Sequence, residues 1–186
     1  MQKIKKLFQK IIKGFFNFFF KIIYGNIIYD KNNLNSSQIK ISQITNKEII
    51  NFYKKKYCIY KIRDGRVYTD NVENVALIDK NKIIDNISFQ QISGFLTTAD
   101  KNSTIKKGTP RLKKKFKGRV LSLAQGASGN SNYYHWLFDL LPKIKLYSEI
   151  YDLKSLDFFY TSELKDFQIS SLIPLGINNI KIIDTD

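Results

Sequence analysis

The last third of the chain alternates short apolar runs with longer helical segments, and this alternation constrains the fold more than any other feature. The apolar runs and helical segments follow one another at residues 120–124, 132–150, 156–160, 165–175 and 180–183. The short runs have the length of buried strands, and Gly176 closes the second helical segment. Strand, helix, strand, helix, strand is the order of half a doubly wound sheet. The sequence therefore predicts an α/β fold with a Rossmann-like βαβαβ unit at residues 119–186.

The N-terminal residues predict an amphipathic helix. Within residues 3–24 a polar stripe recurs every three or four positions, and apolar residues, many of them Phe, cover the rest. A wide apolar face beside a lysine stripe is typical of a helix that lies in a membrane interface. Its longest uncharged stretch, residues 14–20, is too short to cross a bilayer. The alternative is a helix that packs on its own domain.

The region between this helix and the C-terminal unit predicts strands. We expect a helix at 1–25, a linker at 26–46 and a β-rich region at 47–118, which opens with a short helix at 47–56. Asp64-Gly65 suits the positive φ of a tight turn, which predicts a hairpin of strands 58–63 and 66–70. A meander follows through residues 75–79 and 83–84, and residues 86–118 are expected to be an irregular, basic loop.

The charge of the chain is concentrated in two places. The net charge is +15, and fifteen basic residues gather in the first 24 residues and in residues 101–119. Two basic patches on a neutral body fit anionic lipid or phosphate better than nucleic acid, whose binders alternate aromatic and basic residues. The basic run at 106–119 has two interpretations. It is either a solvated loop, or a segment that attracts an anionic acceptor or the membrane surface. Cys58 is the only cysteine, so we expect neither an internal disulfide nor a zinc site.

Residues 131–142 contain the only histidine and the only tryptophan of the chain, behind a glycine-containing loop. His135 and Asp139 are four residues apart, so on a helix they share a face. Asn132 can cap this helix, and we expect Pro142 to kink it. The alternatives are that His135 is a hydrogen-bonded core residue and that Asp139 only pairs locally. The surrounding apolar positions are expected in the core: Trp136, Leu137, Leu140, Leu141 and Ile144.

Residues 132–143, with the sequence NYYHWLFDLLPK, resemble the signature of glycosyltransferase family 61, which includes bacterial enzymes of capsular and surface polysaccharide assembly. The flanks agree at residues 118–123 (GRVLSL), 65–85, 88–89, 167–168 and 175–177. The resemblance covers about residues 57–186. It implies a GT-B architecture and an inverting, metal-independent transfer from a nucleotide sugar without a further cofactor. The donor-binding C-terminal domain of that architecture is absent from this sequence, so we expect an incomplete chain.

Inverting transfer needs a base that accepts the proton of the acceptor hydroxyl. Histidine is the side chain most often used as a general base, so His135 is the candidate. Asp139 could orient the imidazole or could itself be the base. The candidate contacts for a phosphate or sugar precede the helix N-terminus: Gly126, Ser128, Gly129, Asn130 and Asn132. Alternatively, Gly126 and Gly129 serve only a tight turn.

These features together predict the N-terminal, acceptor-side half of a glycosyltransferase at the cytoplasmic face of the cell membrane. Its expected partners are a nucleotide-sugar donor, a polysaccharide or lipid-linked sugar acceptor, and the membrane surface through residues 3–24, but not nucleic acid. The alternative is a non-catalytic, membrane-associated fragment or binding module.

Overall fold

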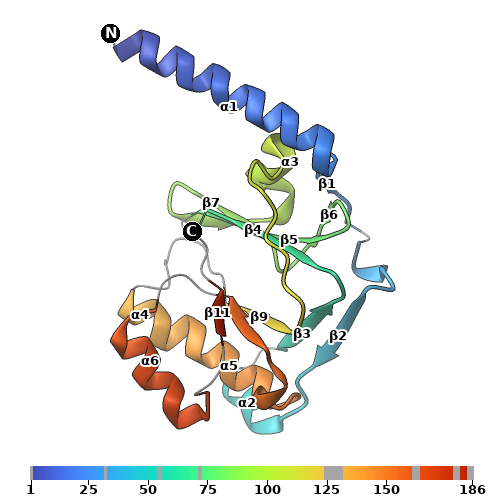
Figure 1. The fold of residues 1–186 in the computed structure, drawn as a ribbon. Helices are drawn as coiled ribbons and strands as arrows, with labels where there is room; N and C mark the ends of the chain where they lie inside the picture. Colours follow the sequence, from blue (N-terminus) through green and yellow to red (C-terminus); the bar gives the residue numbers. More distant parts are fainter. Residues whose placement is uncertain are drawn as a thin grey trace.

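A long N-terminal helix, a β-rich region and a C-terminal α/β unit follow one another along the chain (Figure 1). The computed structural model describes residues 2–31, 33–53, 56–70, 73–123, 132–160, 164–177 and 181–183. The architecture is mixed α/β, as the sequence predicts.

Helix α1 (Gln2–Tyr24) confirms the predicted amphipathic helix. It projects from the body, and its C-terminal end lies over the short helix α3 (Ser103–Lys107) (Figure 1). Phe20 is its one buried residue, while the apolar residues from Ile4 to Ile23 remain exposed to solvent. No helix in the described part of the chain combines the length and apolar character that crossing a membrane requires.

The largest sheet has six strands and follows α1. Its strands are β1 (Ile28–Tyr29), β4 (Arg66–Thr69), β5 (Asn74–Asp79), β6 (Lys82–Ile83), β7 (Phe89–Ile92) and β8 (Phe95–Thr97). The order is β1-β6-β5-β7-β8, with β4 paired to β5; β1 pairs with β6 in parallel and the other pairs are antiparallel. The predicted meander through β4, β5 and β6 is therefore confirmed. Central β5 is buried along most of its length, and it packs on Ile27, Ile83 and Ala99.

The predicted hairpin at Asp64-Gly65 is wrong in its pairing, although both of its strands form. Strand β3 (Cys58–Ile62) pairs antiparallel with β2 (Ile39–Gln43) in a separate sheet of two strands, across helix α2 (Lys47–Tyr53). Strand β4 pairs with β5 instead. Asp64 has the positive φ of a tight turn, 54°, so the local signal is correct. The turn redirects the chain from one sheet to another because each strand finds a partner farther along the sequence.

Two segments have more structure than the sequence predicts. Residues 26–46, predicted as a linker, contribute β1 and β2 to the two sheets. Residues 86–118, predicted as irregular, contain β7, β8, α3 and a short 3-10 helix at Ala99–Lys101. Ser93 and Gly94 both have positive φ between β7 and β8, which is the geometry that closes a tight hairpin.

The C-terminal unit has the predicted alternation of strands and helices. Its elements are β9 (Val120–Ser122), α4 (Tyr133–His135), η3 (Trp136–Leu140), α5 (Leu141–Ser148), η4 (Leu153–Ser155), β10 (Phe158–Tyr160), α6 (Asp166–Leu172), η5 (Ile173–Leu175) and β11 (Lys181–Ile183). The three strands are parallel in the order β11-β10-β9. Gly176 ends the second helical segment in the left-handed conformation, as predicted.

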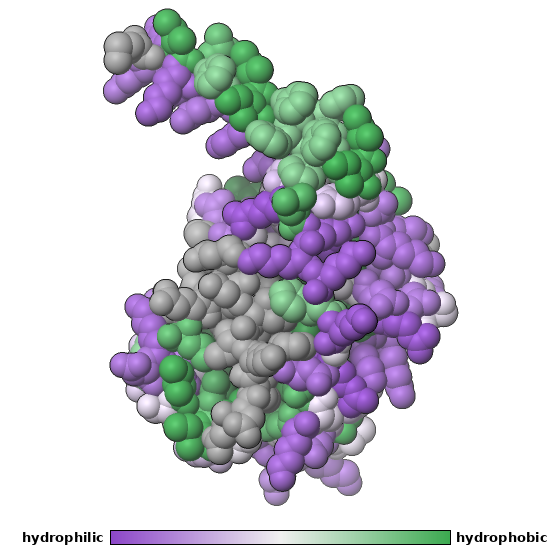
Figure 2. Space-filling view, viewed as in Figure 1, coloured by the Kyte–Doolittle hydropathy of each residue, from purple (hydrophilic) through white to green (hydrophobic). Residues whose placement is uncertain are grey.

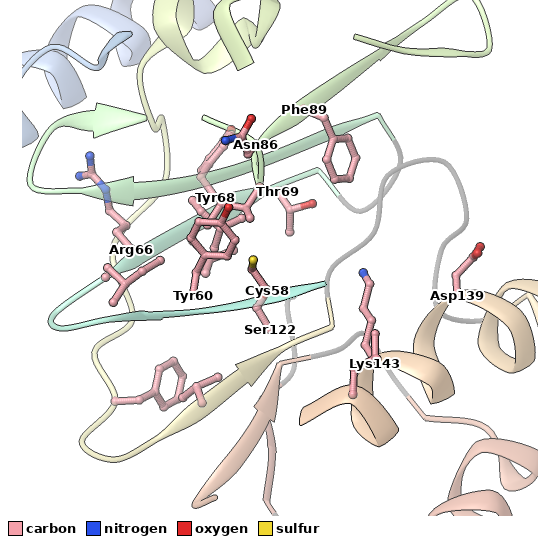
Figure 3. A pocket seen from close by; sticks show the side chains of 18 of the residues that line it. Cys58, Tyr60, Arg66, Tyr68, Thr69, Asn86, Phe89, Ser122, Asp139 and Lys143 are labelled. Carbon is pink, nitrogen blue, oxygen red and sulfur yellow. The ribbon is translucent and has the colours of Figure 1, made fainter. Parts of the chain in front are cut away.

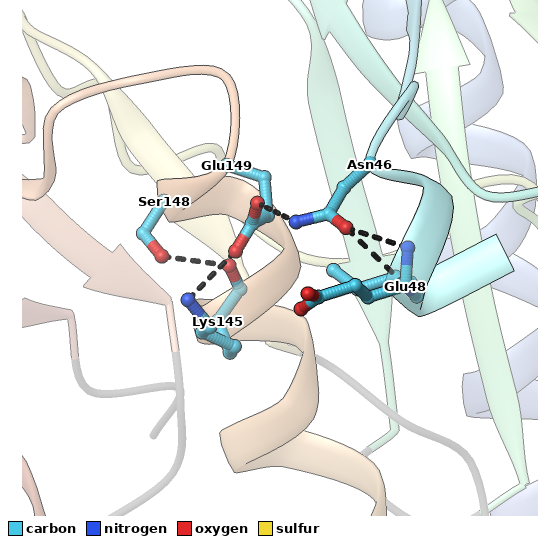
Figure 4. Close-up of polar contacts among 6 residues, drawn as sticks. Asn46, Glu48, Lys145, Ser148 and Glu149 are labelled. Carbon is cyan, nitrogen blue, oxygen red and sulfur yellow. Dashed lines mark hydrogen bonds and ion pairs between the residues drawn. The ribbon is translucent and has the colours of Figure 1, made fainter. Parts of the chain in front are cut away.

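The core of this unit contains the apolar positions that the sequence assigns to it. Trp136, Leu140 and Ile144 are fully buried, and Leu137 and Leu141 pack against them. The same helix contacts the β-rich region through its C-terminal end. There Glu149 accepts a hydrogen bond from Asn46 Nδ2 at 2.8 Å and pairs with Lys145 Nζ at 2.6 Å (Figure 4). These contacts tie α5 to the residue that precedes α2.

Candidate active site

The helix that carries His135 begins at Asn132, as predicted. The side-chain oxygen of Asn132 accepts hydrogen bonds from the backbone N–H groups of Tyr134 and His135, at 3.0 and 3.5 Å. An N-cap of this kind satisfies donors that have no partner within the helix. Four of the predicted contacts for phosphate or sugar lie outside the described residues: Gly126, Ser128, Gly129 and Asn130.

The helix contains a π turn at Trp136–Leu140, immediately before Pro142. The backbone N–H of Leu141 donates to the carbonyl of Trp136, five residues earlier. Proline has no N–H and clashes with the carbonyl of the preceding helical turn, so an irregular turn is required at this point. The structure shows a wider turn just before Pro142, and the predicted kink itself stays a prediction. Such turns are frequent at functional sites.

The π turn holds two polar side chains in direct contact. His135 Nδ1 lies 2.6 Å from Asp139 Oδ2, and the side chains of both residues are about one-third exposed. An ionised carboxylate only accepts hydrogen bonds, so Nδ1 carries the shared proton. In the neutral ring Nε2 is then the nitrogen that can accept a proton. His135 is thus not the buried core residue of the alternative interpretation. The contact fixes the orientation of the ring, and it fits both a carboxylate that orients a base and the alternative in which Asp139 only pairs locally.

A cavity of about 2220 Å³ lies between the β-rich region and the C-terminal unit. Asp139 and Lys143 line it from the helix, and Ser122 lines it from the carboxyl end of β9 (Figure 3). His135 is not among the described lining residues, so the pair meets the cavity through Asp139. The carboxyl ends of parallel strands are where open α/β sheets bind their ligands.

Lys143 follows Asp139 by one helical turn, and its ammonium group points into the cavity (Figure 3). Burial lowers the pKa of Lys143 to about 8, and the negative charge of Asp139 opposes this effect. A lysine of this kind is a cation that desolvation has made a better proton donor. Lys143 was not among the residues predicted for the site, although its spacing of four from Asp139 repeats the spacing of Asp139 from His135.

The lining of the cavity is strongly basic on both the helix and the β-rich side. The basic residues among its described lining are Arg66, Lys80, Arg111, Lys113, Lys114, Lys115, Lys117, Lys143 and Lys145, whereas the acidic ones are Asp64 and Asp139. Much of the lysine-rich run at 106–119 therefore faces the cavity. Residues 111–120 are all exposed, so the run borders the cavity as a solvated loop, and attraction for an anionic ligand stays a prediction.

No family model, curated protein or solved structure matches this chain. In the described part of the chain, no group of three His, Cys, Asp or Glu residues is placed to hold a metal ion.

Proposed function

We propose that the chain is the N-terminal, acceptor-side part of an inverting glycosyltransferase that uses a nucleotide sugar in surface or capsular polysaccharide assembly. The observation that carries this proposal is the 2.6 Å contact between His135 Nδ1 and Asp139 Oδ2 at the margin of a large basic cavity. The resemblance of residues 132–143 to glycosyltransferase family 61 supports it. In this proposal the parallel βαβαβ unit is half of a Rossmann-like sheet of the GT-B type.

The proposed reaction uses His135 as the base. Nε2 takes the proton of the acceptor hydroxyl while that oxygen forms a bond to the anomeric carbon of the donor. The bond between the anomeric carbon and the nucleotide phosphate breaks, and its electron pair leaves with the nucleotide. Asp139 stabilises the imidazolium that results. Positioned bases of this kind contribute rate factors of about 10² to 10⁴.

The cations of the cavity complete the proposed chemistry. A nucleotide that leaves with negative charge is stabilised by positive groups held in a partly desolvated site. Lys143 is the cation closest along the helix to the base, and the basic residues on the β-rich side add to its field. This charge supports a transfer that proceeds without a metal. In the proposal Asn132 and the 126–130 segment contact the phosphate or the sugar.

The proposed location is the cytoplasmic face of the membrane. Figure 2 shows apolar residues along the upper face of α1 and hydrophilic side chains along its lower edge. Phe8 and Phe15 are each 63% exposed and Phe18 is 64% exposed, which suits a helix half immersed among lipid headgroups. The acceptor would then be a growing polysaccharide or a lipid-linked sugar at that surface.

The test is turnover of a panel of nucleotide sugars by a full-length version that includes a donor-binding domain, with and without acceptor extracts. His135→Ala should lower kcat by about 10² to 10⁴ with little effect on KM. Asp139→Asn should also lower kcat. Asp152→Asn is the matched control, because Asp152 is an exposed cap of η4 and its amide can still accept that hydrogen bond. Unchanged turnover in His135→Ala would show that His135 is not the base.

A second candidate function is a non-catalytic module that binds membranes. The exposed apolar face of α1 favours it, since that face does not depend on His135. The two candidates differ in one result. A purely binding chain attaches to vesicles but neither binds nor consumes any nucleotide sugar of the panel.

A further inference from the structure

A guanidinium group with unsatisfied donors lies in the cavity, near the C-terminal end of α1. Arg66 Nε and Nη1 are buried and have no hydrogen-bond partner among the described residues. Nη2 donates to Asn81 Oδ1 at 3.3 Å. Burial lowers the pKa of Arg66 from its ordinary value. Buried donors without an acceptor are costly, so this arrangement calls for one.

Lys113 lies close to this group. Its ammonium is 4.1 Å from the centre of the Tyr24 ring, and its backbone N–H donates to Tyr24 Oη at 3.3 Å. Burial lowers the pKa of Lys113, and the positive charges of Arg66 and Lys115 lower it further. The positive charges of Arg66 and Lys113 therefore repel each other.

Arg66, Lys113 and Arg111 all line the cavity. In the described part of the chain, none of Arg66, Arg111 and Lys113 has a carboxylate within 4.0 Å. The interacting charges of Arg66 and Lys113 thus have no acid within this distance to compensate them.

We propose that Arg66, Lys113 and Arg111 form a phosphate-binding site. Guanidinium N–H groups match the geometry of phosphate oxygens and bind them through paired hydrogen bonds. Because no carboxylate is paired with these cations in the described part of the chain, their N–H groups are available to a phosphate ligand. A bound phosphate would supply acceptors to Arg66 Nε and Nη1, which are closed to solvent in this structure, so the guanidinium would have to turn toward the ligand. It would also neutralise the repulsion between Arg66 and Lys113.

The phosphate belongs to a membrane amphiphile, and this part of the inference rests on the proposed position of α1 at the bilayer. Tyr24, beneath Lys113, is the last residue of α1, whose apolar face is exposed. If the headgroup of an amphiphile occupied the site, its hydrocarbon chain would therefore lie near α1, whose apolar face is exposed. Arg66 lies at one end of the cavity and Asp139 and Lys143 at the other (Figure 3). An extended ligand could place its phosphate at one end and its reacting group at the other.

The test measures binding of the full chain to phosphatidylcholine vesicles that contain phosphatidic acid, or oleate at the same surface charge. Arg66→Gln and Lys113→Gln should each weaken binding to phosphatidic acid about tenfold or more, and abolish the preference over oleate. Lys40 is an exposed charged residue on β2, so Lys40→Gln is the matched control. This variant should retain the binding to phosphatidic acid and the preference over oleate. Equal binding of Arg66→Gln and Lys40→Gln to phosphatidic acid would overturn the site.

A second measurement with a soluble ligand distinguishes a lipid headgroup from a free phosphate compound. Inorganic pyrophosphate should bind wild type but bind Arg66→Gln about tenfold more weakly. The Phe15→Ser/Phe18→Ser double variant should lose vesicle binding and keep pyrophosphate binding. If that variant still bound phosphatidic acid vesicles like wild type, the lipid assignment would be wrong. His135→Ala should leave every one of these measurements unchanged, so the failure of the transfer reaction and that of this site can be told apart.

A folding measurement guards against a purely structural role for Arg66. Since its buried donors have no partner among the described residues, Arg66→Gln should unfold at a denaturant concentration equal to or above that of wild type. A variant that is less stable without any ligand would show that Arg66 serves the fold, and would contradict the inference.

Discussion

Trp136 Nε1 donates a hydrogen bond to Ser171 Oγ at 2.7 Å, and this contact joins the π turn to helix α6. Trp136 is fully buried, so its indole fixes the rotation of the turn that also presents His135 and Asp139. The side chain next to the reactive pair is thus an anchor in the core. The geometry of the site depends on the packing of two helices.

Ser171→Ala removes the acceptor of the buried indole N–H. A buried donor left without a partner costs about 1–3 kcal/mol, so the free energy of unfolding should fall by that amount. Chemical denaturation followed by the fluorescence of the single tryptophan measures it. Ser170→Ala, on the exposed neighbour, is the control and should change stability little. Equal stability of the two variants would mean that the indole bond does not hold the turn.

Asn132→Ala should weaken the start of the helix that carries His135. Its side chain caps two backbone N–H groups, and loss of such a cap costs about 1 kcal/mol. Asn132→Ser keeps a capping oxygen and should retain most of the stability. Urea unfolding of the three proteins tests this, and a serine variant as unstable as the alanine variant would contradict the capping role.

Lys143 should make stability rise with pH in the alkaline range. Its pKa is about 8 in the fold against an ordinary 10.5. Between these values the unfolded chain holds a proton that the folded chain has released, so stability rises as pH rises through this window. Below about pH 8 both states are protonated and the cost of burying the charge is fully present.

Lys143→Met should therefore lose this rise. The measurement is the free energy of unfolding from pH 7 to pH 10.5, with the exposed Lys154→Met as control. Any excess in the free energy of unfolding of Lys143→Met over wild type should shrink as pH increases, or reverse in favour of wild type. A difference that is constant over this range would show that Lys143 does not titrate differently in the two states.

Glu149 should stabilise the contact between α5 and the β-rich region in a pH-dependent way. Hydrogen bonds from Lys145 and then Asn46 lower the pKa of Glu149 below its ordinary 4.5 (Figure 4). Its contribution is therefore complete above about pH 4.5 and is lost as pH falls through the lower folded pKa. Glu149→Gln should be less stable than wild type at neutral pH, with a gap that closes in acid.

Acid titration of unfolding compares this variant with Glu48→Gln, a nearby exposed carboxylate on α2. Glu48→Gln should follow wild type over the whole range. If the difference in the free energy of unfolding between wild type and Glu149→Gln persisted unchanged at low pH, the ionised form of Glu149 would not be the stabilising one.

The sequence predicts this fold well where the signal is local. Lysines and apolar residues at helical spacing predict α1, and the spacing of His135 and Asp139 predicts the contact that the structure shows. Asn132 is a capping residue by its side-chain chemistry, and Pro142 disturbs a helix wherever it occurs inside one. Each of these signals depends only on neighbours within one or two turns.

The errors arise where pairing is not local. Asp64 adopts the turn conformation that its sequence indicates, yet β3 and β4 join different sheets because their partners β2 and β5 lie elsewhere. The strand β1 is two residues long, too short for any pattern to identify. The β7–β8 hairpin was identifiable from Ser93-Gly94, since a serine-glycine pair between apolar runs is a turn signal.

The site was predicted in part for the same reason. The reactive pair lies within one helical turn, whereas Arg66 meets the cavity from a strand about seventy residues earlier. Only the packing of the two parts of the chain brings them to one cavity. The burial that lowers the pKa of Lys143 likewise depends on that packing and not on its neighbours in sequence.

The central claim is that Asp139 holds His135 with its proton on Nδ1, which leaves Nε2 as the base. His135 is the only histidine, so long-range ¹H–¹⁵N correlation NMR of the ring reports it without assignment. In the neutral ring of the wild type we predict a protonated Nδ1 and an unprotonated Nε2, with a shift toward the other tautomer in Asp139→Asn. A wild-type ring protonated on Nε2 would contradict the account.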